Sequence, residues 1–273
     1  MVVKNKNLEE KRMKEQKINE KLASSLTAET TELLPYLGYL LQDLWELGSN
    51  PRIMQSLIEK NIPITPQTKV IDLGCGKGAV AITLAKALNI QVKGIDLLPE
   101  FIEVAKNKAM EYQVTECCKF VVGDLNEVVE TERGYDIAVF GAVGDVLGEP
   151  LVMLDQLKKV IKPQGFLLLD DGYLIGEAEN IRYQNYEYLT LNQWQETFQQ
   201  AGFKVAAMQV VDTANEKEVN DRNNQFIRQR AEELGQQFPE KRDLFLSYVQ
   251  SQENETEDIA TDVVGATWLL QAK

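Results

Sequence analysis

Histidine is absent from all 273 residues of the sequence. The absence excludes a histidine general base, a Ser-His-Asp triad and every metal site that needs a histidine ligand. Any proton transfer in a catalytic step must therefore use Asp, Glu, Tyr, Lys, Cys or water.

Cysteine is also scarce, with three residues at Cys75, Cys117 and Cys118. The count is odd and two of them are adjacent, so we expect no disulfide framework and a reducing, cytoplasmic compartment. No run of about 18 apolar residues occurs, so no membrane span is expected. Residues 1–22 likewise lack the apolar stretch that a secretory signal needs.

Positive charge is in deficit, because 29 Lys and Arg stand against 42 Asp and Glu, for a net charge of −13. A surface this acidic repels phosphate backbones. The one dense basic run, Lys4 to Lys21, is interleaved with glutamates and is typical of a solvated helix or a frayed tail. We therefore expect no nucleic-acid partner.

The chain before residue 61 predicts helices rather than strands. Residues 27–60 carry a stripe of leucines at helical spacing, interrupted by Gly48, Asn50 and Pro51. We expect residues 1–60 to form a helical segment and lid. Residues 61–273 are expected to form the main domain, with a polar helical insertion at about 214–255.

From Lys69 onward, short apolar runs alternate with helical patterns. The runs expected to be strands are residues 70–73, 91–95, 120–122, 137–140, 166–169, 203–211 and 263–270. Strands this apolar, separated by helices, predict a doubly wound α/β sheet that is largely parallel and covered on both faces.

A glycine-rich loop follows the first expected strand, in Asp72-Leu-Gly-Cys-Gly-Lys-Gly78. Glycines let the backbone turn sharply and approach a ligand closely, and the helix that follows offers free N–H groups to an anionic group. The loop also fits the dinucleotide pattern G-x-G-x-x-A through Gly74, Gly76 and Ala79. An NAD-dependent oxidoreductase is therefore one interpretation.

Acidic residues at the ends of the first three strands bear on that choice. Asp72 lies two residues before Gly74, where it would repel a pyrophosphate and attract an amino group or a sulfonium. Asp96 ends the second strand and can accept hydrogen bonds from two ribose hydroxyls, a feature that NAD proteins share. Asp124 follows the third strand and can accept from an adenine amino group.

These motifs together resemble the ordered motifs of class I S-adenosylmethionine (SAM)-dependent methyltransferases. The resemblance also includes Tyr135-Asp-Ile-Ala-Val-Phe140, Phe166-Leu-Leu-Leu-Asp170 and Ala201-Gly202-Phe203, and it covers roughly residues 65–212 plus the last strand. It implies a Rossmann-like, seven-stranded mixed sheet in which the last strand is antiparallel and lies between the fifth and sixth. It also implies a SAM-dependent methyltransferase of the type that acts on small molecules.

The resemblance implies a set of donor-site residues, which are Asp72, Gly74, Cys75, Gly76, Asp96, Leu97, Asp124, Leu125 and Gly141. By the same resemblance, the loop glycines approach the methionine part of SAM and Asp72 orients the loop and the amino group. Asp96 then holds the ribose, Asp124 and the two leucines frame the adenine, and Gly141 faces the sulfonium. Lys77 is expected either in solvent or near the ligand carboxylate.

Residues after the fourth and fifth strands should face the methyl acceptor. Asp145 is the candidate for an acceptor contact or a base, with a helix cap as its alternative role. Asp170 and Asp171 are expected in a solvated turn; a Mg²⁺ site shared with Asp145 is the alternative, and we expect no metal. The aromatic residues that could line an acceptor pocket under the lid are Tyr36, Tyr39, Trp45, Phe226, Phe245 and Tyr248.

A small-molecule acceptor is favoured because a closed helical lid would exclude water and would admit a folded protein or RNA poorly. The alternatives are a protein or tRNA methyltransferase, a non-catalytic SAM-binding protein and the NAD-dependent oxidoreductase. No Asn-Pro-Pro-Tyr-like tetrapeptide follows the fourth strand, as is common in amino-group methylases of DNA and protein. The methylated atom and the oligomeric state stay open.

Overall fold

The computed structural model describes residues 2–184 and 186–273, without the side chains of residues 2–11 and 213–215. Its strands are β1 (Lys69–Leu73), β2 (Gln91–Asp96), β3 (Cys118–Val122), β4 (Tyr135–Gly141), β5 (Ile161–Leu174), β6 (Phe203–Val210) and β7 (Val263–Ala272). Its α-helices are α1 (Val2–Ser25), α2 (Leu34–Leu40), α3 (Pro51–Asn61), α4 (Ala79–Leu88), α5 (Pro99–Glu111), α6 (Leu125–Thr131), α7 (Pro150–Val160), α8 (Leu191–Gln200), α9 (Thr213–Gln237) and α10 (Arg242–Thr261).

Within the described residues, the strands form one seven-stranded sheet in the order β3-β2-β1-β4-β5-β7-β6. Strands β1 to β5 pair in parallel, whereas β7 is antiparallel to both β5 and β6. The mixed sheet with an antiparallel last strand between the fifth and sixth, expected from the sequence, is thereby confirmed. The carboxyl ends of β1, β2, β3 and β4 meet at one edge.

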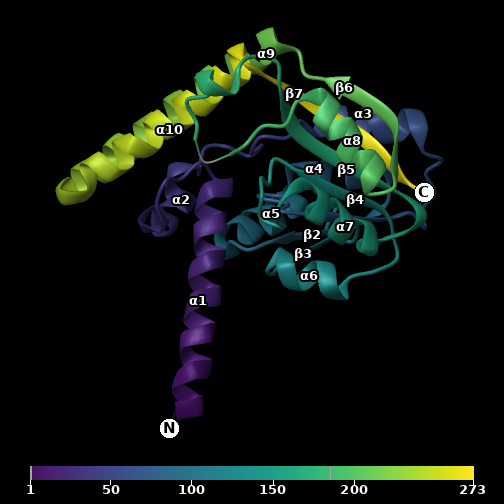
Figure 1. The fold of residues 1–273 in the computed structure, drawn as a ribbon, viewed down its shortest axis with the longest axis horizontal. Helices are drawn as coiled ribbons and strands as arrows, with labels where there is room; N and C mark the ends of the chain where they lie inside the picture. Colours follow the sequence, from purple (N-terminus) through teal and green to yellow (C-terminus); the bar gives the residue numbers. More distant parts are fainter. Residues whose placement is uncertain (1, 185) are drawn as a thin grey trace.

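Helices cover both faces of the sheet, as the run of apolar strands predicts (Figure 1). Successive residues of β4 alternate between two cores: Ala138 and Phe140 pack with α6, α7 and α8, while Ile137 and Val139 pack with α3, α4 and α5. Strands buried on both sides in this way explain why the sequence reads as continuous apolar runs rather than as an alternating pattern.

A third core joins the two regions expected to form a lid. It contains Leu37 and Leu40 of α2, Ile227 and Leu234 of α9, and Phe245 of α10. Helices α9 and α10 run side by side along one side of the molecule in Figure 1. Segments nearly 200 positions apart in sequence therefore stabilise each other by burying apolar surface.

The leucine stripe is interrupted before Pro51, as the sequence predicts, and it also leaves the helical conformation earlier, after Leu40. Helix α2 ends at Leu40, and α3 begins only at Pro51, where the Asn50 side chain accepts hydrogen bonds from the N–H groups of Arg52 and Ile53. A capped start with Pro in the first turn fixes a new helix there. Leu41 and Leu44 stay buried although they lie in turns between the two helices.

Helix α1 leaves the body as a single rod, and residues 12–17 on it are exposed (Figure 1). Of the two interpretations of this charged segment, the helix is the one observed. Only its last turns, around Leu22 and Ser25, approach the rest of the molecule closely enough to line a pocket. In the part of the chain that the structure describes, no helix is both long and apolar enough to cross a membrane.

Candidate active site

The glycine loop turns directly after β1. Gly74, Gly76 and Gly78 have φ of +78°, +51° and +80°, which glycine adopts without strain. A Cβ on Gly74 would lie 2.5 Å from the Cγ2 atom of Val143, so a side chain is also excluded by the loop after β4. The N–H groups of Gly74 and Cys75 both donate to the Ile95 carbonyl at 2.9 Å, which fixes the loop to β2.

A cavity of about 80 Å³ opens beside this loop, and we name it the donor pocket. Six of the residues predicted for SAM binding line it, namely Asp72, Gly74, Cys75, Gly76, Asp96 and Gly141. Leu97, Asp124 and Leu125 lie outside its lining, and Leu125 packs into the core with Val129. The structure thus gathers the loop and strand-end residues but leaves the predicted adenine contacts apart from them.

Asp72 is 3% exposed, and its Oδ2 atom has no hydrogen-bond partner. Burial, and then repulsion from Asp96, raises the pKa of Asp72 to about 7 from an ordinary value of 3.8. An unpartnered buried carboxylate oxygen is costly unless a donor or a cation reaches it. The charge of Asp72 therefore calls for a cationic or hydrogen-bond-donating ligand in the pocket.

Two further carboxylates close the ends of β2 and β3. Asp96 accepts from the Gly76 N–H through Oδ2 and from the Leu98 N–H through Oδ1, both at 2.9 Å, and each oxygen keeps a free lone pair. Asp124 caps α6 by accepting from the Asn126 N–H through Oδ1, while its buried Oδ2 has no partner. Asp124 is thus both a helix cap and an unfilled acceptor.

Lys77 does not lie in solvent, and it is among the residues that line the donor pocket. Its side chain is buried, and its ammonium donates to the backbone carbonyls of Leu41 and Leu44 beyond the end of α2. The indole N–H of Trp45 donates back to the Lys77 carbonyl at 3.0 Å. Lys77 therefore fastens the turns after α2 to the glycine loop, and burial lowers its pKa to about 8.

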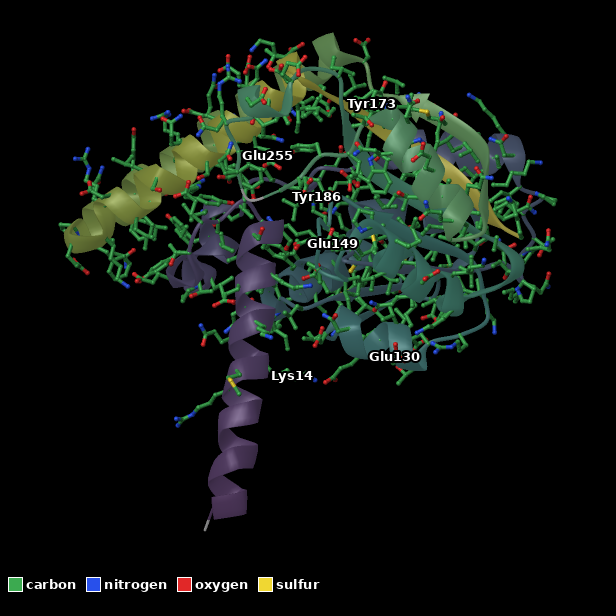
Figure 2. All side chains as sticks on the ribbon, viewed as in Figure 1. Lys14, Glu130, Glu149, Tyr173, Tyr186 and Glu255 are labelled. Atoms are coloured by element: carbon green, nitrogen blue, oxygen red, sulfur yellow. The ribbon has the colours of Figure 1, made fainter. Side chains whose placement is uncertain are left out.

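A second cavity of about 230 Å³ adjoins the donor pocket, and we name it the acceptor cavity. The two share Ser25 and Leu26 at the end of α1, Leu47 in the turn before α3, and Ala142 after β4. The rest of the acceptor cavity is lined by the end of α1 and the residues after it, the turns after α2, the loop after β4, β5 and the segment after it, α9, α10 and β7. Figure 2 labels Tyr186 and Glu255 in the region where α10, the end of α1 and the sheet meet.

Asp145 lies at this cavity but is exposed. Its alternative role as a helix cap is wrong, because residues after it form a turn and α7 begins only at Pro150, behind Glu149. Lys21 donates to the Asp145 backbone carbonyl at 3.0 Å. Asp145 therefore stands at the rim, with its carboxylate toward solvent.

Asp170 and Asp171 do not lie in a solvated turn. They continue β5, paired with Thr267 and Ala266 of β7, and both line the acceptor cavity. The strand runs on to Leu174 because β7 pairs with it from Phe166 to Leu174. A turn was expected because the sequence of β5 itself gives no sign of that partner.

Most of the aromatic residues predicted for the acceptor pocket lie elsewhere. Tyr248 lines the acceptor cavity and Trp45 the donor pocket, but Tyr36 and Phe245 pack on each other with ring centroids 5.0 Å apart. Tyr39 and Phe226 are exposed. The sequence analysis missed three lining tyrosines, Tyr183, Tyr186 and Tyr188. Their close spacing directly after the fifth strand was the available signal.

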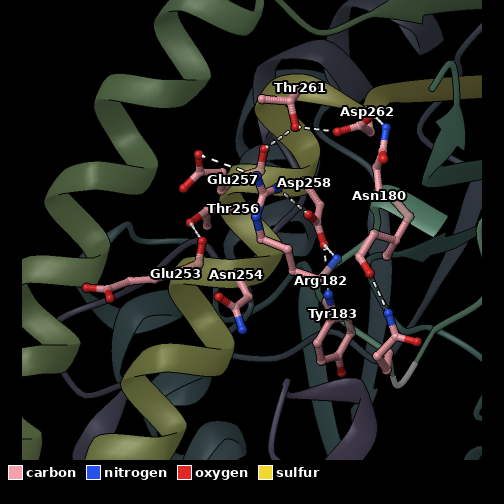
Figure 3. A network of polar contacts seen from close by, with 12 residues as sticks. Asn180, Arg182, Tyr183, Glu253, Asn254, Thr256, Glu257, Asp258, Thr261 and Asp262 are labelled. Atoms are coloured by element: carbon pink, nitrogen blue, oxygen red, sulfur yellow. Dashed lines mark hydrogen bonds and ion pairs between the residues drawn. The ribbon is translucent and has the colours of Figure 1, made fainter. Parts of the chain in front are cut away.

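The tyrosine-bearing segment is anchored to α10 by one buried carboxylate. Asp258 is 0% exposed and accepts from the Arg182 and Tyr183 N–H groups and from the Arg182 guanidinium, each at 2.8 Å (Figure 3). The Tyr183 hydroxyl in turn donates to the Ser24 carbonyl of α1 at 2.9 Å. The network ties three separate segments into one wall of the acceptor cavity.

Among residues 2–184 and 186–273, no group of three or more Cys, Asp or Glu side chains is placed to hold a metal ion.

The part of the chain that carries this site is similar to a known protein family. A family model described as a methyltransferase domain matches residues 64–224, which hold β1 to β6 and the glycine loop. The chain belongs to this methyltransferase family. The resemblance to class I SAM-dependent methyltransferases noted from the sequence is thereby confirmed.

Curated relatives match a smaller part of the chain. Ribosomal protein L11 methyltransferase of Laribacter hongkongensis (strain HLHK9) is 30% identical over 135 residues, which is 49% of this chain and 42% of that protein. Demethylmenaquinone methyltransferase of Staphylococcus aureus (strain JH9) is 29% identical over 119 residues, or 43% and 48%. The chain therefore spans less than half the length of either relative.

Solved structures share the fold over most of the chain. A SAM-dependent methyltransferase from Thiobacillus denitrificans, in complex with S-adenosyl-L-homocysteine, has a TM-score of 0.72 and 20% identity over 87% of this chain and 98% of that one. The [4+2]-cyclase SpnF has a TM-score of 0.67 and 16% identity over 88% and 92%. At these identities the likeness confirms the class I fold and no more.

Proposed function

We propose that the protein binds SAM in the donor pocket and transfers its methyl group to a small molecule in the acceptor cavity. The observation that carries the proposal is Asp72, whose buried carboxylate oxygen has no partner behind the glycine loop. A pyrophosphate brought to this loop would meet that negative charge, whereas an amino group or a sulfonium would be attracted by it. The chemistry of the loop therefore favours SAM over NAD.

The residues present fit SAM. Asp72 would act on the amino group, and Asp96 would accept from the ribose hydroxyls with its free lone pairs. The unpartnered Oδ2 of Asp124, at the end of the neighbouring strand β3, would accept from the adenine amino group. Gly74 and Gly76 leave the space that the methionine part needs, and Gly141 lies at the junction with the acceptor cavity.

When bound, SAM supplies a methyl group on a sulfonium sulfur, which an acceptor atom displaces in line while the sulfur keeps the bonding electron pair. The protein's own task is then alignment and exclusion of water, because the leaving group is already activated. Four residues shared by the two cavities, Ser25, Leu26, Leu47 and Ala142, line the passage where such a displacement would occur.

A small acceptor is supported by how the cavity is enclosed. Its walls come from the end of α1, from residues 41–48, and from α9 and α10, so we propose that residues 1–60 and 214–255 form the lid of a domain over 61–273. A volume of about 230 Å³ suits a compact molecule. The S. aureus relative is by name a demethylmenaquinone methyltransferase. The L. hongkongensis relative, by name specific for a ribosomal protein, keeps a protein acceptor as the second candidate.

Calorimetric titration of the purified protein with SAM, with S-adenosylhomocysteine and with NAD⁺ tests the donor site. We expect both adenosyl ligands to bind and NAD⁺ not to bind. Asp96→Ala should abolish that binding, and Asp155→Ala, at an exposed position on α7, is the matched control. Binding of NAD⁺ without SAM would overturn the proposal. SAM binding with no labelled methyl transfer to any small molecule in a cell extract would leave the non-catalytic alternative.

A further inference from the structure

The acceptor cavity collects carboxylates. Asp170 and Asp171 come from β5, Glu216 from α9 and Glu255 from α10. They are close enough to repel one another, because Asp171 and Glu216 both raise the pKa of Asp170, and Asp171 contributes to raising that of Glu255. Two more acids, Glu46 and Asp145, lie at the exposed side of the cavity.

Three of these inner carboxylates accept from hydroxyl or backbone N–H donors, and among the described residues none of the four is paired with a cation. Asp170 accepts from the Thr267 hydroxyl at 2.5 Å. Asp171 accepts from the Tyr186 hydroxyl and from the Gly172 N–H, both at 2.6 Å. Glu255 accepts from the Thr27 hydroxyl at 2.6 Å. No lysine or arginine stands among the residues that line the cavity, and Lys21, at its rim, donates to backbone carbonyls instead.

Glu216 lacks even a neutral partner: within the described part of the chain, no hydrogen bond or ion pair reaches its carboxylate. Its oxygens point at Gly265 of β7, 3.6 Å from where a Cβ would lie there, and burial alone raises its pKa. Glu216 is only partly buried, and a partly buried carboxylate without a donor is stabilised when a cation or a donor joins it.

The other lining residues fit the body of such a cation. Tyr186 and Tyr188 meet edge to face, with ring centroids 4.9 Å apart, and Tyr183 and Tyr248 complete an aromatic lining beside the acids. Aromatic faces attract organic ammonium groups. Six aliphatic side chains form an apolar part of the wall, namely Leu26, Leu41, Leu44, Leu47, Ile227 and Ile259. The amides Asn220, Asn223, Asn224 and Gln252 also line the cavity and add neutral polar groups. The cavity therefore has an acidic, aromatic end and an apolar side.

Building on the methyl transfer proposed above, we propose that the acceptor is a compact primary or secondary amine with an apolar body. Its ammonium group binds among Asp170, Asp171, Glu216 and Glu255, and its nitrogen is the atom that is methylated. A neutral alcohol would leave these four acids uncompensated, and a carboxylic acid would be repelled by them.

The chemistry of an amine acceptor requires one proton transfer. An ammonium nitrogen has no lone pair, so it first passes one proton to a carboxylate of the cavity and becomes a neutral amine. The lone pair then forms the N–CH₃ bond as the C–S bond breaks, and the product is a methylated ammonium. Asp170, with a pKa of about 7, and Asp171, with one of about 6, are suited to receive that proton. The backbone carbonyl of Asp170 accepts from the Ala142 N–H at 3.0 Å, at the junction with the donor pocket.

Matched probes test the proposal without any methyl donor. Butylamine, 1,4-diaminobutane and phenethylamine, each paired with its alcohol and carboxylic acid of similar size, are titrated by calorimetry into the protein. We expect at least one amine to bind tenfold or more tightly than its matched alcohol, and no carboxylic acid to bind. If no amine binds, or if each alcohol binds as well as its amine, the proposal is wrong.

Variants at two of the four acids test whether these carboxylates bind the amine. Glu216→Gln and Asp171→Asn should each weaken amine binding about tenfold, and Asp155→Asn on α7 should not change it. An equal loss in all three would contradict the assignment. Titration with S-adenosylhomocysteine keeps the two proposals apart: if it binds while no amine does, the donor site stands and the amine acceptor fails. If amines bind while S-adenosylhomocysteine does not, the amine site stands and the proposed donor site fails.

Discussion

The donor pocket and the acceptor cavity share one passage but are assembled in different ways. The predicted donor residues that line the pocket lie between Asp72 and Gly141, in the loop that follows β1 and near the carboxyl ends of β1, β2 and β4. The acceptor cavity takes residues from Ser24 to Gly265, from three regions that meet only in the folded molecule. The lining of the donor pocket is thus determined largely by short sequence motifs, whereas the lining of the acceptor cavity depends on long-range packing.

The buried carboxylates of the two regions differ in whether their oxygens have hydrogen-bond partners. Asp72 and Asp124, on the donor side, each keep one oxygen without a partner. Asp258, behind the acceptor cavity, has its hydrogen bonds filled by two backbone N–H groups and a guanidinium. A satisfied buried charge holds structure, and an unsatisfied one marks a place for a ligand.

The sharpest test of the donor side is Gly74→Ala. The added methyl group would meet Val143 at 2.5 Å, and we expect S-adenosylhomocysteine to bind on the order of 100-fold more weakly, or about 2.7 kcal/mol, by calorimetry. Gly134→Ala is the control, because Gly134 also has a positive φ, +81°, but nothing within 4 Å of its Cβ position. Equal losses in both variants would assign the effect to backbone strain rather than to the pocket.

Asp258→Ala tests the acceptor side. It removes the acceptor of the Arg182 and Tyr183 N–H groups, which costs about 1–3 kcal/mol and lowers the Tm by roughly 3–10 °C. We expect amine affinity to fall with it while S-adenosylhomocysteine affinity changes less than twofold. Calorimetry and thermal unfolding of the same preparation measure the three quantities. A parallel loss of both ligands would show that the two regions are not independent.

The pH dependence of stability sharpens the comparison further. Burial raises the folded-state pKa of Asp170 to about 7 from 3.8, so the folded protein holds this proton more tightly than the unfolded chain. Asp170 therefore lowers stability progressively as pH rises from about 4 to about 7, and the loss stays constant above that range. Asp170→Asn removes this dependence.

For Asp170→Asn without ligand, we expect a Tm equal to that of the unmodified protein at pH 4 and higher by several degrees Celsius at pH 8. The other buried acids, such as Asp72, contribute equally to both proteins and cancel in the difference. A Tm difference that is the same at every pH would mean that Asp170 does not titrate in this range.

The smallest effect is expected at the outer part of α1. Lys14 forms an ion pair with Glu127 of α6 at 2.9 Å, but the two side chains are 60% and 69% exposed. Exposed pairs contribute little because water and salt screen them, so Glu127→Gln should leave the Tm within about 1 °C and both ligand affinities unchanged. A clear loss of affinity for S-adenosylhomocysteine would instead indicate that the outer part of α1 helps to shape the donor pocket.

The strands and the glycine loop could be predicted from local patterns, whereas the sheet order was implied by the resemblance to class I methyltransferases. Apolar strand runs and the spacing of Asp72, Asp96 and Asp124 each lie within a few residues of the feature that they indicate. The helix that begins at Thr190 with a capping box, through Gln193, is local in the same way. Such signals need no knowledge of distant segments.

The acceptor side could not be predicted to the same extent. Asp170 and Asp171 lie in a strand only because β7 pairs beside them, and their burial comes from helices that begin more than 40 positions later. Lys77 is buried because the turns after α2 offer two carbonyls to it. The prediction that Tyr36 and Phe245 line the acceptor pocket was wrong for the same reason, because these two side chains pack against each other instead.

The place of β7 in the sheet has a consequence for how the protein is made. Of the described strands it leaves the ribosome last, yet it lies between β5 and β6 and hydrogen-bonds to both. A growing chain can form β1 to β4 and the glycine loop while β5 and β6 still present open edges, which are prone to pair with other chains. Translation of the last strand both closes those edges and delivers Thr267 and Gly265 to the acidic cavity. The nascent chain therefore completes β1 to β4 and the glycine loop, which line the donor pocket, before it completes the wall of the acceptor cavity.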